Sequence, residues 1–347
     1  MFRAGSWRLQ VIHSWTNQSL KSCRHHQQYH RSLSTSLNVN MSKTDKLTEK
    51  ERPPFNYNEA FRVTESPQPN FKPGTGGAGS EFLQDWRKKG DDVGYTTVDP
   101  EKTEPRNLYR LLIGGVIPRP IAFVSSIAEN GTHNLAPFSY FNVIGHDPPL
   151  LIISCSKPGP DKDKDTAANI RANKTFTVNI ISEPFVDNAN WTSVNAPRDV
   201  DEWFGSGLTM EKSTLVAPPR VKESAFSMEC ELWKDIDLVK PNAQPTGVLI
   251  IGLIKLIHVR NDILIHPEDA NVDSGARPFT VDPAKLRAVS RMGGITYGRI
   301  GEGFETPRPV WNEVKDVYSS KSTTEDKKGT ETSGGGPVDD GLTGGKM

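Results

Sequence analysis

The chain of 347 residues is long enough for one large domain or two, and its formal net charge is zero. A balanced charge argues against a nucleic-acid or membrane-surface role for the protein as a whole. Apolar residues make up 35%, and glycine and proline number 29 and 26, so we expect much of the length to lie outside a packed core.

The first 40 residues contain no Asp or Glu and are rich in Arg, Ser and His. This composition is typical of a mitochondrial presequence, and the continuous apolar core of a secretory signal is missing. We therefore predict a presequence over residues 1–40 and a location in the mitochondrial matrix. Two alternatives stay open: a disordered basic tail, and a cytoplasmic protein if translation starts at Met41.

Residues 41–104 are polar and rich in Pro, Gly and Lys, which predicts an extended arm or linker with a short helix around "SEFLQDWRKK", residues 80–89. The "GTGGAG" of residues 74–79 matches the dinucleotide-binding glycine pattern, but no strand precedes it, so we interpret it as linker. Residues 312–347 contain almost no apolar side chains and are predicted to be disordered.

Residues 105–311 carry the strand-like segments, rich in β-branched and aromatic residues and bounded by Gly, Pro, Asn and Asp. The dipeptide Asn130-Gly131 predicts a tight hairpin between the first two segments. Two short helices are expected, one over 166–173 capped by Asp165 or Thr166, and one after Asp282. Many strands and few helices indicate a mainly β, antiparallel barrel instead of a doubly wound sheet. The predicted strands lie at 120–128, 134–144, 150–156, 175–181, 226–239, 247–259 and 262–265.

Several motifs point to no site. "DKDKDT", residues 161–166, begins like a calcium loop but lacks the required Gly and Glu. His26 and His30 are spaced for a metal ion but have no third ligand, and we predict no metal site. No nucleophile-elbow motif is present, and no run of about 18 apolar residues predicts a membrane span.

The hairpin region remains as the candidate site. Ser125 and Ser126 end one strand, and pairing across the turn brings them near Asn134 and Ala136. Ser139 and Asn142, beside Phe141, add small polar groups suited to a flat heteroaromatic ligand. At the predicted helix start, cationic and hydroxyl side chains favour a phosphate. On pattern alone, a polar barrel rim and an ordinary capped helix explain these residues equally well.

The series from "IPRPIAFVSSIAENGTHNLAPFSYFNVIGHDPPLLIIS" through "KDTAANI" and "FTVNI" to "SRMGGITYGRI" resembles the flavin reductase-like family of FMN-binding split barrels. The resemblance covers about 105–300, with the motifs in the family's order. It implies a Greek-key-like antiparallel split β-barrel with short helices and disordered terminal extensions. It also implies a homodimer that holds FMN without a covalent bond near the subunit interface.

The resemblance further implies which residues contact FMN. The segments of Ser125–Ser126 and 134–142 would contact the ring, ribityl chain and phosphate. Lys164, Asp165 and Thr166 would help to hold the phosphate, and Arg291 lies in the family's late motif near the site. No acid or base is required of the protein, because the cofactor supplies most of the chemistry.

Two classes of function follow. The first is an FMN-dependent oxidoreductase, either an NAD(P)H:flavin reductase with NADH or NADPH as electron donor or a flavoprotein oxygenase. The second is a non-enzymatic flavin-binding electron carrier. A related barrel acting on a pyridoxine-type substrate is a third option. The segment 183–220 either covers the flavin as a lid or builds the substrate site, and Trp191, Trp203 and Phe204 either stand in the nicotinamide's place or pack on the barrel.

Overall fold

The computed structural model describes residues 52–73, 80–159, 162–265 and 279–325. The predicted presequence, the "GTGGAG" segment and the tail from residue 326 lie outside the described residues. Unit 1, residues 1–58, has only residues 52–58 described, and all helices and strands named below belong to unit 2, residues 59–347. The described chain contains no helix long and apolar enough to cross a membrane.

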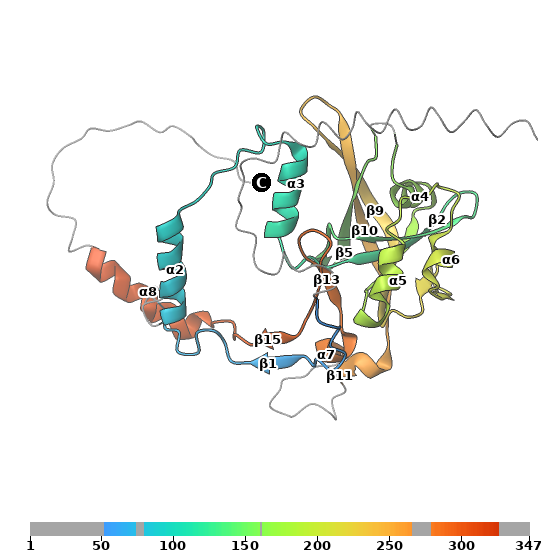
Figure 1. The fold of residues 1–347 in the computed structure, drawn as a ribbon. Coiled ribbons are helices and arrows are strands. Elements are labelled where there is room, and N and C mark those ends of the chain that lie inside the picture. The colour runs from blue at the N-terminus through green and yellow to red at the C-terminus, as the bar shows by residue number, and fades with distance from the viewer. Residues whose placement is uncertain (1–51, 74–79, 160–161, 266–278, 326–347) are drawn as a thin grey trace, which may run out of the picture. The chain divides into compact units, whose positions relative to one another are not determined.

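The large sheet has seven strands in the order β3-β2-β6-β9-β10-β5-β4, and every neighbouring pair is antiparallel (Figure 1). Its strands are β2 (Ala122–Ile127), β3 (His133–Phe138), β4 (Phe141–His146), β5 (Pro149–Ser156), β6 (Thr175–Asn179), β9 (Phe226–Val239) and β10 (Pro245–Val259). Smaller two-stranded pairings involve β1 (Arg62–Thr64), β7 (Met210–Glu211), β8 (Arg220–Val221), β11 (Leu264–Ile265), β12 (Thr280–Val281), β13 (Val289–Arg291), β14 (Tyr297–Arg299) and β15 (Glu302–Phe304).

The helices lie between the strands in sequence, except for α8, which follows β15. They are α2 (Glu81–Val93), α3 (Pro105–Gly115), α4 (Asp165–Asn173), η3 (Glu183–Phe185), α5 (Val186–Trp191), α6 (Glu202–Ser206), η4 (Asn261–Ile263), α7 (Pro283–Leu286) and α8 (Trp311–Glu325). The helix expected around 80–89 is confirmed as α2, where the Leu83 N–H donates to the Ser80 hydroxyl.

Each face of the β2–β3–β6 region carries its own hydrophobic core. One core joins Val124, Phe138 and Phe176 with Ala167 and Ile170 of α4, and it continues along β5, β9 and β10. The other core lies under the segment after β6. It contains Phe123, Leu135, Phe185, Trp203 and Val221. Alternating side chains of the same strands feed the two cores, as expected for a sheet covered on both faces.

The mainly β fold is as predicted, with strands β2, β5, β6, β9 and β10 close to their expected bounds. The segment 134–144, expected as one strand, is two. The pairing of β3 with β2 ends before Ser139, and the pairing of β4 with β5 begins after Tyr140. The Tyr140 carbonyl accepts a hydrogen bond from the Ser154 N–H at 2.9 Å. Phe138 and Phe141 still share one core, so β3 and β4, at the two edges of the sheet order, lie close together.

Two further expectations need correction. The N-cap of α4 is Lys164, not Asp165 or Thr166, and its side chain makes no capping bond. The tail expected to be disordered from residue 312 begins as the helix α8, Trp311–Glu325. Within the arm, β1 pairs in parallel with β15, and Arg62 lies opposite Glu302.

Candidate functional site

The β2–β3 hairpin forms the frame of the site, and its turn is the expected Asn130-Gly131. Gly131 has a backbone φ of +88°, which residues other than glycine rarely adopt. The Asn130 side chain accepts a hydrogen bond from the Thr132 N–H at 3.0 Å. The resulting register places Ser126 opposite Asn134, as predicted from the sequence. Ala136 lies opposite Val124 instead of a serine and packs against the α4-side core.

Ser126, Asn134, Thr166 and Asn169 form a buried polar cluster between this hairpin and α4, which we call the hairpin–α4 cluster. Asn134 Nδ2 donates to Thr166 Oγ1 at 2.9 Å and to Ser126 Oγ at 3.5 Å. Asn169 Nδ2 also donates to Ser126 Oγ, at 3.2 Å. The bonds fix the start of α4 on the hairpin, because buried polar groups are costly unless they are paired.

The start of α4 has the chemistry of an anion site. Lys164 is exposed, and no described group accepts from the N–H of Thr166 or Ala167. Helix-start N–H groups and a nearby cation both favour a phosphate. Thr166 Oγ1 accepts from Asn134 but donates to no described group, so its proton is free for a ligand. These three features fit the phosphate of a flavin nucleotide.

The acidic residues around this helix start are neutralised by partners. Burial raises the pKa of Asp163, but ion pairs with Lys157 at 2.7 Å and Arg171 at 2.9 Å lower it further, below its usual value. Asp165 lies 3.8 Å from Arg198, whose Nη2 donates to Asn169 Oδ1 at 3.4 Å. The carboxylates therefore do not cancel the positive character contributed by Lys164.

A cavity of about 170 Å³ lies at the other end of β3, on the opposite face of the hairpin. It is lined by Ile121, Pro137, Ser139, Asn190, Ser193, Arg291 and Tyr297. The sequence analysis singled out Ser139 and Arg291, and the fold brings them together although they are far apart in the chain. An isoalloxazine ring fits a wall of this kind, made of a proline, an aromatic ring and small polar groups.

Pro137 belongs to an edge strand, which explains how a strand can contain it. The Leu135 N–H points away from β2, because it donates to Glu202 Oε2 at 3.3 Å. The direction of the backbone N–H groups alternates along a strand, so the nitrogen of residue 137 also faces outward, where a proline costs no ladder hydrogen bond.

Burial raises the pKa of Glu202, and the neighbouring Asp165 and Asp201 raise it further.

Arg291 and Tyr297 are fixed by local contacts within the cavity wall. The Arg291 guanidinium lies 4.5 Å from the centre of the Tyr297 ring and donates to the carbonyls of Gly294 and Ile295. The Tyr297 hydroxyl donates to Asn190 Oδ1 at 2.9 Å. Burial raises the pKa of Tyr297, although Arg291 partly opposes this, so the phenol keeps its proton.

Sequence reasoning missed Arg119, a buried arginine that connects three elements near the cavity. It donates to the carbonyls of Val116 at 2.9 Å and Met292 at 3.0 Å, and to Ser139 Oγ at 3.5 Å. Its backbone also pairs with that of Arg291. The sequence feature that could have identified Arg119 is its position between two prolines in an otherwise apolar run. Asn190 and Tyr297 were also missed.

Three nominated residues lie away from both groups. Phe141 is buried in the α4-side core, and Asn142 is exposed, its side chain accepting from the Val143 N–H. Ser125 is fully buried on the face opposite Ser126, and its hydroxyl has no partner among the described residues. In the segment 183–220, Trp203 packs in the core, whereas Trp191 and Phe204 are 59% and 94% exposed.

Comparisons with known proteins show which family the chain belongs to. Residues 114–269 match the family described as "Flavin reductase like domain". An uncharacterized protein of Halalkalibacterium halodurans is 33% identical over 219 residues, which is 63% of this chain and 99% of that protein. The chain belongs to the flavin reductase-like family. Membership supports a flavin-linked oxidoreductase as the class of function.

Two solved structures are similar to this chain over most of their own length. Nitrilotriacetate monooxygenase component B from Bacillus cereus is 32% identical with a TM-score of 0.56, covering 61% of this chain and 99% of that one. The 2-nitrobenzoate 2-nitroreductase of Pseudomonas fluorescens is 27% identical with a TM-score of 0.52, covering 62% and 98%. Both similarities cover nearly the whole length of the solved chain and agree with the mainly β, antiparallel fold expected from the resemblance.

Proposed function

We propose that this protein binds FMN along edge strand β3 and accepts hydride from NADH or NADPH, acting as a flavin reductase or as the flavoprotein partner of an oxygenase. The observation that supports this proposal most directly is the course of β3. It runs from the start of α4, which has no side-chain cap, to a cavity suited to an aromatic ring. Asn134 contacts Thr166 at the helix start, and Pro137 lines the cavity. Three residue steps along the strand separate Asn134 from Pro137, about 10 Å.

Each end of β3 would hold one part of FMN. The N–H groups of the first turn of α4, the Thr166 hydroxyl and Lys164 would bind the phosphate. Pro137, Ser139 and Tyr297 would contact the ring. The bound flavin supplies the hydride chemistry, and the protein orients the ring and excludes water from one face.

The full-length protein tests the proposal directly. We expect a yellow protein that releases FMN on denaturation and whose colour is bleached anaerobically by NADH or NADPH. A colourless protein that micromolar FMN cannot reconstitute contradicts the proposal. Bleaching by dithionite alone favours the second candidate class, a flavin carrier or an oxygenase component supplied by another reductase.

A comparison of FMN with riboflavin tests the phosphate position. Lys164→Ala and Thr166→Ala should each weaken FMN binding by about 1–3 kcal/mol, the range for a lost hydrogen bond to a charged group. Riboflavin has no phosphate, so its affinity should change little. Lys174→Ala, at the opposite end of α4, is the matched control. Equal losses for FMN and riboflavin would assign the residues another role.

We also propose that the protein is a homodimer. A cavity of about 170 Å³ is below the roughly 300–1,000 Å³ usual for ligand pockets, so one chain provides part of a flavin site. Tyr109, Leu111 and Leu112 of α3 are exposed, and Arg119 ties the end of this helix to the cavity. A partner covering α3 would extend the cavity wall. Light scattering of the purified protein should give twice the mass of the chain, and Leu112→Glu should shift it toward the monomer.

For localisation, we propose import into mitochondria, supported by the acid-free composition of residues 1–40. Fused to a fluorescent reporter, this segment should direct the reporter to mitochondria, whereas a protein starting at Met41 should stay in the cytosol. A diffuse signal from the full segment removes this proposal and leaves the flavin proposal intact.

A further inference from the structure

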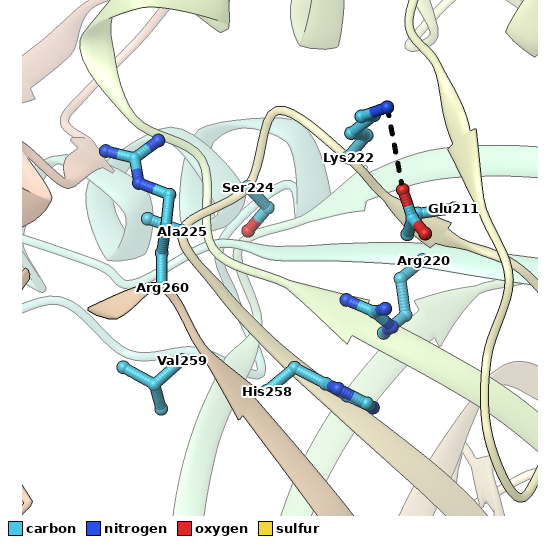
Figure 2. Close-up of a pocket in the computed structure, with 8 residues that line it drawn as sticks. All are labelled: Glu211, Arg220, Lys222, Ser224, Ala225, His258, Val259 and Arg260. Carbon is cyan, nitrogen blue, oxygen red and sulfur yellow. Dashed lines mark ion pairs between the residues drawn. The ribbon is translucent and has the colours of Figure 1, made fainter. Parts of the chain in front are cut away.

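A second cavity, of about 290 Å³, lies between the β7–β8 hairpin and the end of β10 (Figure 2). It shares no lining residue with the cavity at Pro137. Most of its charged side chains are basic. They are Arg220, Lys222 and Arg260, with Glu211 as the carboxylate, and the imidazole of His258 completes the polar lining. Figure 2 shows Arg260 on the left of the cavity and Arg220 and His258 on the right.

Arg220 is held in place through both of its neighbours in the chain. The Pro219 carbonyl accepts from Thr177 Oγ1 at 3.0 Å, and the Val221 N–H donates to Asn179 Oδ1 at 3.0 Å. Thr177 and Asn179 are fully buried in β6. The backbone that carries the guanidinium is therefore fixed before any ligand binds, which reduces the entropy lost on binding.

The guanidinium of Arg220 has unused donors. Its Nη2 donates to the Lys212 carbonyl at 3.3 Å, but its Nε is shielded from solvent and has no partner among the described residues. No carboxylate of the described chain lies within 4.0 Å of it. An arginine with free donors in a cavity wall is suited to an oxyanion, because the fork of N–H groups matches two oxygens.

A buried carboxylate holds the two walls of the cavity together. Glu229 accepts from the N–H groups of Thr214, Leu215 and Val216 on the chain leading to Arg220, at 2.7, 2.6 and 3.2 Å. It also bonds the His258 Nε2 of β10 at 2.6 Å. These bonds use the acceptor sites of Glu229, so its carboxylate supports the two walls of the cavity.

The other cations differ in how strongly they are paired. Arg260 makes two short bonds with Asp262, at 2.6 and 3.0 Å, and Lys222 lies 3.9 Å from Glu211. Both pairs are largely exposed, and such pairs are weak and easily exchanged. Arg220 is thus the principal donor, and Lys222 and Arg260 add positive charge at the rim.

We propose that this cavity is a binding site for a phosphate-class oxyanion, either free phosphate or the phosphate group of a small phosphoester. A volume of about 290 Å³ is at the lower end of the range for ligand pockets, which favours a small ligand. The site is separate from the position proposed for the flavin phosphate at α4.

Calorimetric titration of the full-length protein, first saturated with FMN, tests the site with inorganic phosphate and with glycerol 3-phosphate at constant ionic strength. We expect saturable binding that Arg220→Gln weakens at least about tenfold, the loss of a hydrogen bond to a charged group. Arg260→Gln should weaken it less. Lys240→Gln, an exposed lysine between β9 and β10, is the control and should leave binding unchanged. Circular dichroism verifies that each variant is folded.

Tighter binding of glycerol 3-phosphate than of phosphate identifies a phosphoester ligand, and the reverse identifies free phosphate. Heats equal to those of a sodium chloride titration, or binding that Arg220→Gln leaves unchanged, overturn the proposal. If the protein holds no flavin, the same titrations on Lys164→Ala protein exclude binding at α4. The result for this cavity is therefore independent of the flavin proposal.

Discussion

Two buried polar clusters join outlying segments to the large sheet, and they differ in charge. The hairpin–α4 cluster is neutral, and its hydroxyls and amides fix a helix start where a cation and N–H groups remain available. The cluster around Glu229 is charged, and four donors occupy its carboxylate. The charged cluster therefore has no capacity left for a ligand and supports its neighbours, whereas the neutral cluster leaves groups at its border that can bind one.

The largest expected effect comes from removing the charged support. Glu229→Ala should lower the free energy of unfolding by about 3–5 kcal/mol, because the N–H groups of Thr214, Leu215 and Val216 and the His258 ring lose a fully buried acceptor. Urea unfolding measures it. Glu231→Ala, two residues along β9, is the control: its side chain is 49% exposed and lies 3.3 Å from Lys255, so it should cost less than about 1 kcal/mol. Equal losses would mean that Glu229 is not a structural support.

The pH dependence of the free energy of unfolding also distinguishes the charged cluster from the neutral one. Burial raises the pKa of Glu229, but its backbone donors and His258 lower it further, below the usual value. A carboxyl group with a lowered folded-state pKa stabilises the fold above its unfolded value of about 4.3, and this is lost as the pH falls through the folded-state pKa. The stability advantage of the wild type over Glu229→Gln should therefore be present above about pH 5 and be lost as the pH falls below about 4. An advantage that persists at the lowest pH contradicts the assignment.

An intermediate effect is expected at the neutral cluster. Asn134→Ala should lower the free energy of unfolding by about 1–3 kcal/mol, because Thr166 and Ser126 lose a buried donor. It should also weaken FMN binding, since α4 loses its attachment to the hairpin. Asn142→Ala, an exposed amide on β4, should stay within about 0.5 kcal/mol. Fluorescence titration with FMN and urea unfolding give the two readouts. A stable Asn134→Ala protein with normal FMN affinity would remove the distinction between the clusters.

The smallest effect on stability is expected at the cavity. Tyr297→Phe removes the hydrogen bond to Asn190 and should cost at most about 1 kcal/mol, since this bond is exposed. Because Tyr297 would contact the flavin ring, the dissociation constant for FMN should rise. Fluorescence titration with FMN measures this. An unchanged FMN affinity would place the ring elsewhere.

The sequence predicted the parts of the fold that depend on local pattern. Apolar runs located β5, β9 and β10, and Asn130-Gly131 located the hairpin. The break between β3 and β4 was not predictable, because aliphatic and aromatic residues lie on both sides of Ser139 in "NLAPFSYFNVI" and the break depends on pairing Tyr140 with Ser154. The tail was judged by composition, which misses a helix such as α8, whose Trp311 and Tyr318 rings lie 5.4 Å apart.

Within the site, residues joined by the hairpin were predictable and residues joined by the tertiary fold were not. Ser126 and Asn134 follow from the register of one turn. Tyr297 meets Asn190 across 107 positions, and Glu229 meets His258 across 29, through the register of two strands with bulges. Such contacts depend on the tertiary fold, including shifts of strand register at β-bulges, and a local sequence motif does not contain this information.

The parallel pairing of β1 with β15 bears on how far the protein can be trimmed. Arg62 pairs with Glu302 across 240 positions, its side chain bonding the Glu302 carboxylate at 2.7 Å, and Phe61 packs at Gly303. A fragment that starts at the apparent barrel boundary near residue 105 keeps β15 and removes its only described neighbour strand. The exposed backbone edge would then be open to pairing with other chains. Fragments that start before Phe61 should stay dispersed at concentrations where those starting at 105 aggregate.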